Sequence, residues 1–263
     1  MTEQARRDEY SSIVITGANR GMGLEFARQY ANDGWRVFAT ARSPGSAKAL
    51  QALSLKHALL TVHALDVSSS TSVSEFADEL RGQAIDVLLS NASHMINLPE
   101  QCFERGDPDL FAQSFEVNAV GPFRLAQGLI DNVRAGEQKK LVFMGSTAGS
   151  TSSIVAPVKL FAYCPAKAAL HSIVRGLHLN LSTDGISVGL LEPGVVDTQG
   201  FADLQPGEPA PYGMDVVVDM LRAGTLQMST PAEAVVKLRT LIDTLTPDTG
   251  GVLRHVEGHI IPW

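Results

Sequence analysis

Short apolar runs alternate with helical patterns along the whole of this 263-residue chain. The first run, residues 12–16 (Ser-Ile-Val-Ile-Thr), is β-branched and apolar, which is typical of a buried strand in a parallel sheet. Runs of this kind predict seven strands, near residues 12–16, 35–40, 58–64, 86–90, 139–145, 186–191 and 252–256. Helical spacing of apolar residues predicts helices near residues 22–33, 45–55, 71–81, 108–134, 161–183 and 231–245.

This alternation predicts an α/β fold, a Rossmann-type doubly wound parallel sheet of about seven strands with helices on both faces. The crossovers between parallel strands are expected to be right-handed. The sequence contains no internal repeat, low-complexity segment or linker. We therefore expect a single domain over residues 1–263.

One segment, residues 197–230, interrupts the alternation. Its prolines and glycines include Pro206, Gly207, Pro209, Pro211, Gly213 and Gly224, and its larger apolar residues include Phe201, Tyr212, Met214, Met220 and Met228. Long connections in a compact domain are usually functional loops, so we predict a substrate lid with a short helix over residues 216–221. The alternative is a peripheral insertion that packs on its own surface.

Charge and cysteine content narrow the class of protein. A net charge of −7 without any basic run argues against nucleic acid or an anionic membrane as a partner. No apolar run approaches the roughly 18 residues that a membrane span needs, and residues 1–10 are polar, unlike a secretion signal. Cys102 and Cys164 are far apart and have no metal-ligand spacing, so we expect free thiols, no metal site and a cytoplasmic location.

The turn Thr16-Gly17-Ala18-Asn19-Arg20-Gly21-Met22-Gly23 follows the first strand and precedes a helix. Gly17 permits a tight turn, while Gly21 and Gly23 lack a Cβ and let a pyrophosphate and the helix approach closely. Unpaired N–H groups at a helix start attract phosphate. The turn therefore predicts a dinucleotide site.

Tyr163 and Lys167 are four residues apart and so share one face of a predicted helix. A neighbouring ammonium favours the phenolate, so Lys167 is expected to lower the pKa of Tyr163 below about 10. Such a tyrosine transfers a proton near neutral pH. Pro165 fits only the first turn of a helix, so Tyr163 is expected at a helix start.

From Ser12 to Trp263 the chain resembles the short-chain dehydrogenase/reductase family. The shared features are the glycine turn, residues 86–92 (Asp-Val-Leu-Leu-Ser-Asn-Ala), the tyrosine–lysine pair, and Pro193-Gly194 with Thr198 after it. The closest likeness is to the branch of C-factor and sniffer-like carbonyl reductases, through residues 19–25, 37–42 and the closing Ile261-Pro262-Trp263. One departure is Ser90-Asn91-Ala92-Ser93, where the family has Asn-Asn-Ala-Gly.

The resemblance implies a catalytic tetrad of Asn118, Ser146, Tyr163 and Lys167. Tyr163 would act as general acid or base, Ser146 would stabilise negative charge on the substrate oxygen, and Lys167 would also hold the nicotinamide ribose. Asn118 would hold a water beside Lys167. The resemblance and the glycine turn together imply these cofactor contacts: Gly17, Asn19, Arg20, Gly21, Met22, Gly23, Arg42, Asp66, Val67, Asn91, Ala92, Tyr163, Lys167, Pro193, Gly194, Val196 and Thr198.

The choice of cofactor depends on the end of the second strand. A carboxylate there would bind the ribose hydroxyl of NAD and repel a phosphate, but the strand ends Ala39-Thr40-Ala41-Arg42. Arg42, helped by Arg20, suits the 2′-phosphate of NADP(H). We therefore expect NADP(H) rather than NAD(H).

The function expected from these features is reduction of a carbonyl group on a fairly apolar small molecule with NADP(H). Two alternatives stay open: an NAD(P)-dependent alcohol dehydrogenase working in the oxidative direction, and a non-catalytic dinucleotide-sensing or signalling protein. The expected substrate contacts are His94, Ser146, Thr147, Tyr163, Met214 and Met220. A homo-oligomer, dimer or tetramer, is also expected.

Overall fold

The computed structural model describes residues 10–154 and 159–263. Within them, eight strands form one sheet in the order β3-β2-β1-β4-β5-β6-β7-β8, parallel throughout except for the β7–β8 pair. The strands are β1 (Ser12–Ile15), β2 (Arg36–Ala41), β3 (Leu60–Ala64), β4 (Val87–Ser90), β5 (Lys140–Met144), β6 (Ser187–Glu192), β7 (Leu253–His255) and β8 (Ile260–Ile261). The predicted doubly wound α/β fold is confirmed.

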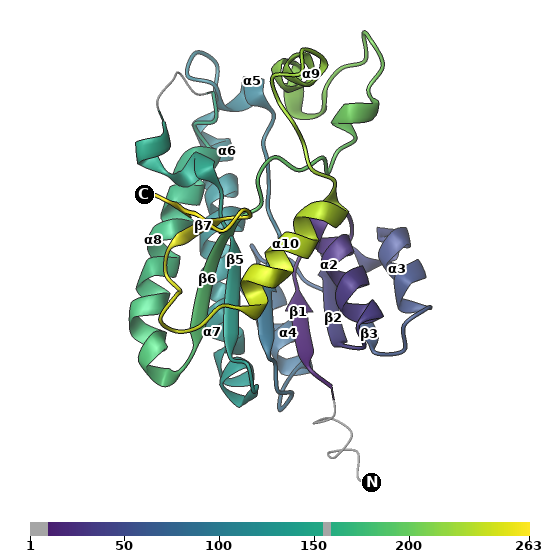
Figure 1. Cartoon of the computed structure of the whole chain (residues 1–263), viewed down its shortest axis with the longest axis vertical. Helices are drawn as coiled ribbons and strands as arrows, with labels where there is room; N and C mark the ends of the chain where they lie inside the picture. The colour runs from purple at the N-terminus through teal and green to yellow at the C-terminus, as the bar shows by residue number, and fades with distance from the viewer. Residues whose placement is uncertain (1–9, 155–158) are drawn as a thin grey trace.

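Helices connect the strands and cover both faces of the sheet (Figure 1). They are α2 (Gly21–Asn32), α3 (Lys48–Ser54), α4 (Ser70–Glu79), α5 (Leu98–Gln101), α6 (Pro108–Phe115), α7 (Gly121–Ala135), α8 (Tyr163–Leu181), α9 (Asp215–Arg222) and α10 (Pro231–Asp243). In the part of the chain that is described, no helix combines the length and the apolar character that a membrane span requires.

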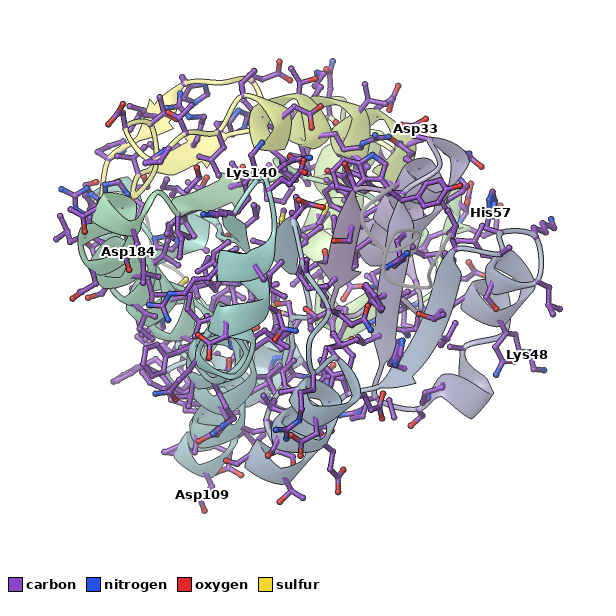
Figure 2. All side chains as sticks on the ribbon, turned by 90° about the horizontal axis from the view of Figure 1, so that it is seen from below. Asp33, Lys48, His57, Asp109, Lys140 and Asp184 are labelled. Atoms are coloured by element: carbon purple, nitrogen blue, oxygen red, sulfur yellow. The ribbon has the colours of Figure 1, made fainter. Side chains whose placement is uncertain are left out.

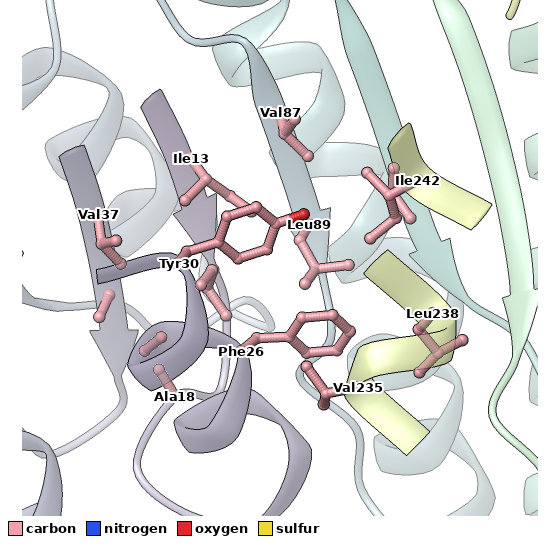
Figure 3. Packing of buried hydrophobic residues seen from close by; sticks show 14 of the residues in the cluster. Ile13, Ala18, Phe26, Tyr30, Val37, Val87, Leu89, Val235, Leu238 and Ile242 are labelled. Atoms are coloured by element: carbon pink, nitrogen blue, oxygen red, sulfur yellow. The ribbon is translucent and has the colours of Figure 1, made fainter. Parts of the chain in front are cut away.

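Alternate residues of each strand face opposite sides of the sheet, and two cores result. Ile13 and Ile15 of β1 belong to one core with residues of α2 and α10, whereas Val14 belongs to the other with residues of α4, α7 and α8. Figure 3 shows the first core, where Phe26 and Tyr30 of α2 lie between the sheet and α10. The two cores hold the strands side by side. The candidate site lies at the carboxyl ends of these strands.

The helix predicted over residues 108–134 is interrupted. A π-helical turn, η2 (Glu116–Val120), separates α6 from α7. Pro122 has no N–H to donate to the carbonyl of Asn118, so an α-helical hydrogen bond is lost at this point. The interruption lies at a predicted catalytic residue, as π-turns often do.

Figure 2 views the opposite end of the molecule, where the parallel strands begin and Lys140 lies. Lys140 is almost fully buried at the start of β5. Its Nζ donates to the carbonyl oxygens of Ile242 (2.8 Å) and Asp243 (3.0 Å) at the end of α10. A cation at a helix C-terminus stabilises the helix, so Lys140 ties α10 to the sheet.

Candidate active site

The glycine turn brings the ends of β1 and β4 together. A Cβ on Gly17 would lie 2.9 Å from the Cα of Ala92, and one on Gly23 would lie 2.2 Å from the carbonyl oxygen of Gly17. Gly17 also has a positive φ of 67°. No larger side chain fits at either position, so these glycines are required by the close packing of the turn against β4.

Asn91 and Ala92 hold this packing through hydrogen bonds. The backbone N–H groups of Asn91 and Ala92 both donate to Oγ1 of Thr16, at 3.0 and 2.9 Å. The Asn91 amide donates to the carbonyl oxygen of Thr16 (2.9 Å). The predicted cofactor residues of the two segments are therefore neighbours.

The start of α2 is open to an anion. Arg20 occupies the N-cap with extended backbone and gives no side-chain cap, and the first turn of α2 has no acidic residue. Asn19 and Arg20 are exposed beside it, while Met22 packs partly against the core. Uncapped N–H groups with a partial positive charge are what a pyrophosphate requires.

Arg42 is exposed directly after β2, next to β1 in the sheet. Burial is the larger cause of a lowered pKa at His94, and the positive charge of Arg42 lowers that pKa further. Arg42 and His94 therefore lie on the same side of the site. Asp66 follows β3, where its carboxylate accepts hydrogen bonds from Oγ and N–H of Ser68 (2.6 and 3.0 Å), and the carbonyl of Val67 accepts from Arg124 (2.9 Å).

Tyr163 is the first residue of α8, as predicted, and Pro165 lies in the first turn of the helix. The backbone N–H of Tyr163 donates to Oε1 of Gln101 (3.2 Å), a side chain that is fully buried at the end of α5. This contact satisfies one of the N–H groups that a helix start leaves unpaired. It also fixes where the tyrosine enters the site.

The predicted low pKa of Tyr163 is wrong. Burial raises the pKa to about 12, while the neighbouring hydroxyls of Ser146 and Ser93 act in the opposite direction. Lys167 Nζ lies 5.6 Å from the centre of the tyrosine ring, and it donates to the carbonyl oxygen of Met144 (2.8 Å). Desolvation therefore outweighs the charge of the ammonium in this structure.

Lys167 is itself almost fully buried, and burial lowers its pKa to about 8. The spacing of four residues places it one turn after Tyr163 on α8. The Lys167 ammonium donates one hydrogen bond, to the Met144 carbonyl oxygen. Its remaining N–H donors are therefore available to a ligand. Such an arrangement suits a group that grips a ribose.

Asn118 is fully buried in the π-helical turn, and its amide bridges that turn to the segment after β4. Oδ1 accepts from Oγ of Ser93 (2.8 Å) and from N–H of His94 (2.9 Å). Nδ2 donates to the carbonyl of His94 (2.8 Å) and to Oγ of Ser114 (3.1 Å). The side chain is thus occupied by protein contacts, and the predicted water beside Lys167 stays a prediction.

Ser146 follows β5 and faces Tyr163. Its backbone N–H donates to Nε2 of His171 (3.3 Å), and its Oγ accepts from N–H of Ala148 (3.2 Å). Burial, together with the charge of Lys167, lowers the pKa of His171 to about 4, so the imidazole stays neutral and can accept. The neighbouring Thr147 is exposed.

The segment after β6 approaches the glycine turn from the other side. Gly194, with φ of 74°, donates its N–H to Oε2 of Glu192 (2.6 Å) after Pro193. A Cβ on Gly21 would lie 3.1 Å from the Cβ of Thr198, so Thr198 contacts the turn. Pro193, Gly194, Val196 and Thr198 are all partly exposed, as a ligand contact requires.

The segment predicted as a lid is closed at its base, because Val196 and Ser229 form a parallel bridge. Figure 1 shows α9 with α5 at the end of the molecule where the parallel strands finish. The predicted short helix is confirmed as α9. The segment has a small core of its own, formed by Phe201, Ala210 and Val218 with Leu204, Met214, Val217, Leu221 and Met228 packed on it. Met214 thus packs inside the segment and Met220 is exposed, so both stay predictions as substrate contacts.

The side chain of Arg20 attaches this segment to the glycine turn. Arg20 donates to Oε1 of Gln199 (2.7 Å) and to the hydroxyl of Tyr212 (3.1 Å). Burial alone would raise the pKa of Asp197, but backbone N–H donors from residues 199–202 lower it below its usual value. Arg20 was predicted to meet a phosphate, and in this structure its partners are Gln199 and Tyr212 of the segment predicted as a lid.

A cavity of about 420 Å³ lies between α5 and the segment over residues 197–230. Its lining is Leu98, Pro99, Cys102, Glu104, Arg105, Lys159, Gly213 and Val216. None of the predicted tetrad residues lines this cavity, although Cys102, which does, directly follows the Gln101 whose side chain accepts from N–H of Tyr163. It offers mixed apolar and charged walls to a small molecule.

Sequence patterns missed several residues that shape the site: Ser93, Gln101, Ser114, Glu192 and His171 as a support for Ser146. The one signal available was the serine at position 93, where the resembled family has glycine. The others make contacts across long sequence separations, which spacing does not reveal.

A family model described as short chain dehydrogenase matches residues 11–209. The chain belongs to this family. It is 30% identical over 260 residues to an uncharacterized oxidoreductase of Schizosaccharomyces pombe, covering 95% of this chain and 96% of the relative. The family match and this relative identify the protein as an oxidoreductase, as predicted.

Solved structures of similar fold include carbonyl reductases. An NADPH-bound carbonyl reductase from chicken fatty liver has a TM-score of 0.80 at 24% identity, covering 97% of this chain and 99% of that one. The carbonyl reductase Sniffer of Drosophila melanogaster has a TM-score of 0.78 at 20% identity, with coverage of 97% and 100%. A carbonyl reductase from Pseudomonas aeruginosa has a TM-score of 0.74 at 26% identity, with coverage of 96% and 100%. The predicted resemblance to the carbonyl reductase branch is confirmed.

Proposed function

We propose that this short-chain dehydrogenase reduces a ketone or aldehyde on a fairly apolar small molecule, with NADP(H) as cofactor. The observation that carries the proposal is the convergence of the Tyr163 phenol, the Ser146 hydroxyl and the Lys167 ammonium at one end of α8. A dinucleotide-sensing protein has no need for a phenol and an ammonium together in this arrangement. We therefore prefer an enzyme to a sensor.

The residues present fit a dinucleotide. The pyrophosphate would be held by the uncapped start of α2 and by the glycine turn. The glycines there have no Cβ, so only backbone would face the pyrophosphate. Arg42 would pair with a 2′-phosphate, because a guanidinium matches phosphate geometry. An alcohol dehydrogenase of Thermococcus sibiricus, 25% identical, is known in complex with 5-hydroxy-NADP, which supports the same cofactor class here.

The chain's own residues would perform the proton chemistry. When bound, the reduced nicotinamide supplies the hydride for the carbonyl carbon. Tyr163 donates its phenolic proton to the carbonyl oxygen, and Ser146 donates a hydrogen bond to the same oxygen as negative charge develops. Lys167 holds the cofactor ribose and places its positive charge near the phenolate that remains.

The pKa of Tyr163 favours reduction over oxidation. With a pKa raised to about 12, the phenol keeps its proton at neutral pH and is ready to act as an acid. An alcohol dehydrogenase needs the phenolate as its base, so that alternative requires a larger pKa change on cofactor binding. Loss of NADPH absorbance with a panel of aliphatic and aromatic carbonyls tests the proposal. Turnover only with alcohols and NADP⁺ would favour the oxidative alternative, and none with either panel would favour the sensor.

We expect Arg42→Asp to reverse the cofactor preference. A charge-assisted hydrogen bond to phosphate contributes about 1.5–3 kcal/mol, so NADPH should bind about tenfold more weakly or worse, while NADH binding should improve. Calorimetric titration of each cofactor measures both changes. Arg81→Asp makes the same charge change on an exposed residue just beyond α4 and should leave both affinities nearly unaltered. Equal affinities for both cofactors in wild type and in Arg42→Asp would refute the assignment.

We expect residues 199–228 to close over the substrate. The segment has exposed apolar residues, including Val216 and Met220, that would gain by covering an apolar ligand, and closure would exclude water. Hydrogen exchange of this segment should slow when oxidised cofactor and a substrate analogue are added together. Peptides around Ser182–Asp184, which precede the start of β6 at the opposite end of the sheet from the site, serve as the unchanged reference. Identical exchange in both states would make the segment a peripheral insertion.

A further inference from the structure

His171 packs against the serine loop, residues 145–149, which carries Ser146. The imidazole is almost fully buried on α8, one turn after Lys167. A Cβ on Gly149 would lie 2.6 Å from Cε1 of His171, and one on Gly145 would lie 3.2 Å from Nε2. The ring can approach the loop this closely because both ends of the loop are glycine.

A hydrogen bond joins this imidazole to the backbone of Ser146. The Ser146 N–H donates to Nε2 of His171 across 3.3 Å, and a flipped ring would present Cε1 to the same N–H. Because Nε2 accepts, the ring proton lies on Nδ1, which is buried and has no hydrogen-bond partner among the described residues. A buried N–H without a partner is unfavourable, so the ring is placed for its Nε2 contact rather than for its own polar satisfaction.

Trp263, which follows β8, contacts the same histidine and holds the chain just after the serine loop. Its ring lies edge-on to the imidazole, with 5.6 Å between the ring centres. Its carbonyl oxygen accepts from the N–H of Ser152 (3.1 Å), and the carbonyl oxygen of Pro262 accepts from the hydroxyl of Ser150. The histidine therefore contacts both the serine loop and a residue that fixes the continuation of that loop.

We propose that His171 is a positioning residue for Ser146, because its imidazole fixes the backbone from which the Ser146 hydroxyl reaches the substrate oxygen. This inference rests on the proposed role of Ser146 in stabilising negative charge on that oxygen. A donor stabilises such charge only when it is placed accurately, and an error of about 1 Å costs up to about 100-fold in rate. Burial, and then the charge of Lys167, lower the pKa of His171 to about 4, so Nε2 stays an acceptor at neutral pH.

The competing explanation is that His171 only fills space in the core. His178, seven residues later on α8, provides the matched comparison. Its Nδ1 is also buried without a hydrogen-bond partner among the described residues, and a Cβ on Gly251 would lie 2.4 Å from its Cδ2. Gly251 precedes β7 and is not part of the serine loop. His178→Leu therefore removes a similarly packed imidazole from the same helix at a point away from Ser146.

The first test uses NMR and needs no turnover. Isotope-labelled histidine reports which ring nitrogen carries the proton, and His171→Gln identifies the resonance of interest. We expect a neutral ring protonated on Nδ1 in the wild-type protein, a result that does not depend on whether any variant folds well. A ring proton on Nε2 would overturn the inference, because such a ring cannot accept from Ser146.

Hydrogen exchange of the Ser146 amide gives the second NMR measurement. His171→Leu should speed this exchange about tenfold or more, because the N–H loses its acceptor. His171→Gln should restore slow exchange, since an amide oxygen can accept the same N–H, and His178→Leu should leave it unchanged. An unchanged Ser146 amide in His171→Leu would overturn the inference.

Turnover then separates positioning from packing. His171→Leu should lower kcat by about 10- to 100-fold with little change in KM, and His171→Gln should recover most of the loss. In the Ser146→Ala background the same leucine change should lower kcat by less than about twofold, because the hydroxyl that it misplaces is already gone. An equal loss in both backgrounds would mean that the histidine only packs. A Ser146 amide that responds as expected in a protein that reduces no carbonyl would count against the proposed function alone.

Discussion

Replacing Tyr163 with phenylalanine is expected to reduce carbonyl turnover by about 100- to 10,000-fold while NADPH affinity stays close to wild type. The phenol is the proton donor, and a benzene ring of the same shape has no proton to give. The ring itself should still pack at the start of α8, because the backbone contact of Tyr163 with Gln101 does not involve the hydroxyl. Single-turnover kinetics for the chemical step and calorimetry for NADPH separate the two effects.

The matched control for this experiment is Tyr10→Phe, since Tyr10 is exposed near the N-terminus. It should retain wild-type turnover. Removal of the Tyr163 hydroxyl leaves the neighbouring hydroxyls of Ser146 and Ser93 without one contact, so a small change in the free energy of unfolding is also expected. Undiminished turnover in Tyr163→Phe would exclude the tyrosine from the mechanism and with it the proposed acid.

Most of the sheet could be predicted because each buried strand is a compact β-branched or apolar run between polar turns. The strand β8 was missed because its two residues, Ile260 and Ile261, are too few to form a period-2 pattern. The break within residues 108–134 was missed for a different reason. The apolar spacing continues through it, and the interruption comes from the polar contacts of Asn118 and from Pro122.

The candidate site could be located from sequence but its electrostatics could not. The spacing of Tyr163 and Lys167 predicts that they are neighbours, yet the pKa of the tyrosine depends on how deeply the phenol is buried, which spacing does not report. Similarly, the contact between Ser93 and Asn118 joins segments 25 residues apart. Such contacts depend on the packing of the π-helical turn against α8 and of α7 against β4, so they appear only once the fold is assembled.

Lys167→Met is expected to inactivate the protein and, at the same time, to stabilise it. The depression of the Lys167 pKa from 10.5 to about 8 corresponds to about 3 kcal/mol of unfavourable free energy for holding the charge in a buried site at neutral pH. Methionine removes that charge and fills a similar volume, but the Met144 carbonyl loses its donor, which costs about 1–2 kcal/mol. We therefore expect a net gain of about 1–2 kcal/mol in the free energy of unfolding at pH 7, together with weaker NADPH binding and a fall in kcat of at least about 100-fold.

The pH dependence gives this prediction a second, independent readout. Between pH 8 and 10.5 the folded wild-type protein has released the Lys167 proton while the unfolded chain still binds it, so the lysine makes stability rise with pH across this interval. The methionine variant should lack that rise, and its stability advantage should shrink as the pH approaches 10.5. Urea unfolding at several pH values measures both effects. Lys48 is the exposed first residue of α3 and is labelled in Figure 2. The control variant Lys48→Met should alter neither turnover nor the pH slope of stability. A Lys167→Met protein that is less stable than wild type at pH 7 would mean that the ammonium is well compensated, and that the strain assigned to this buried lysine does not exist.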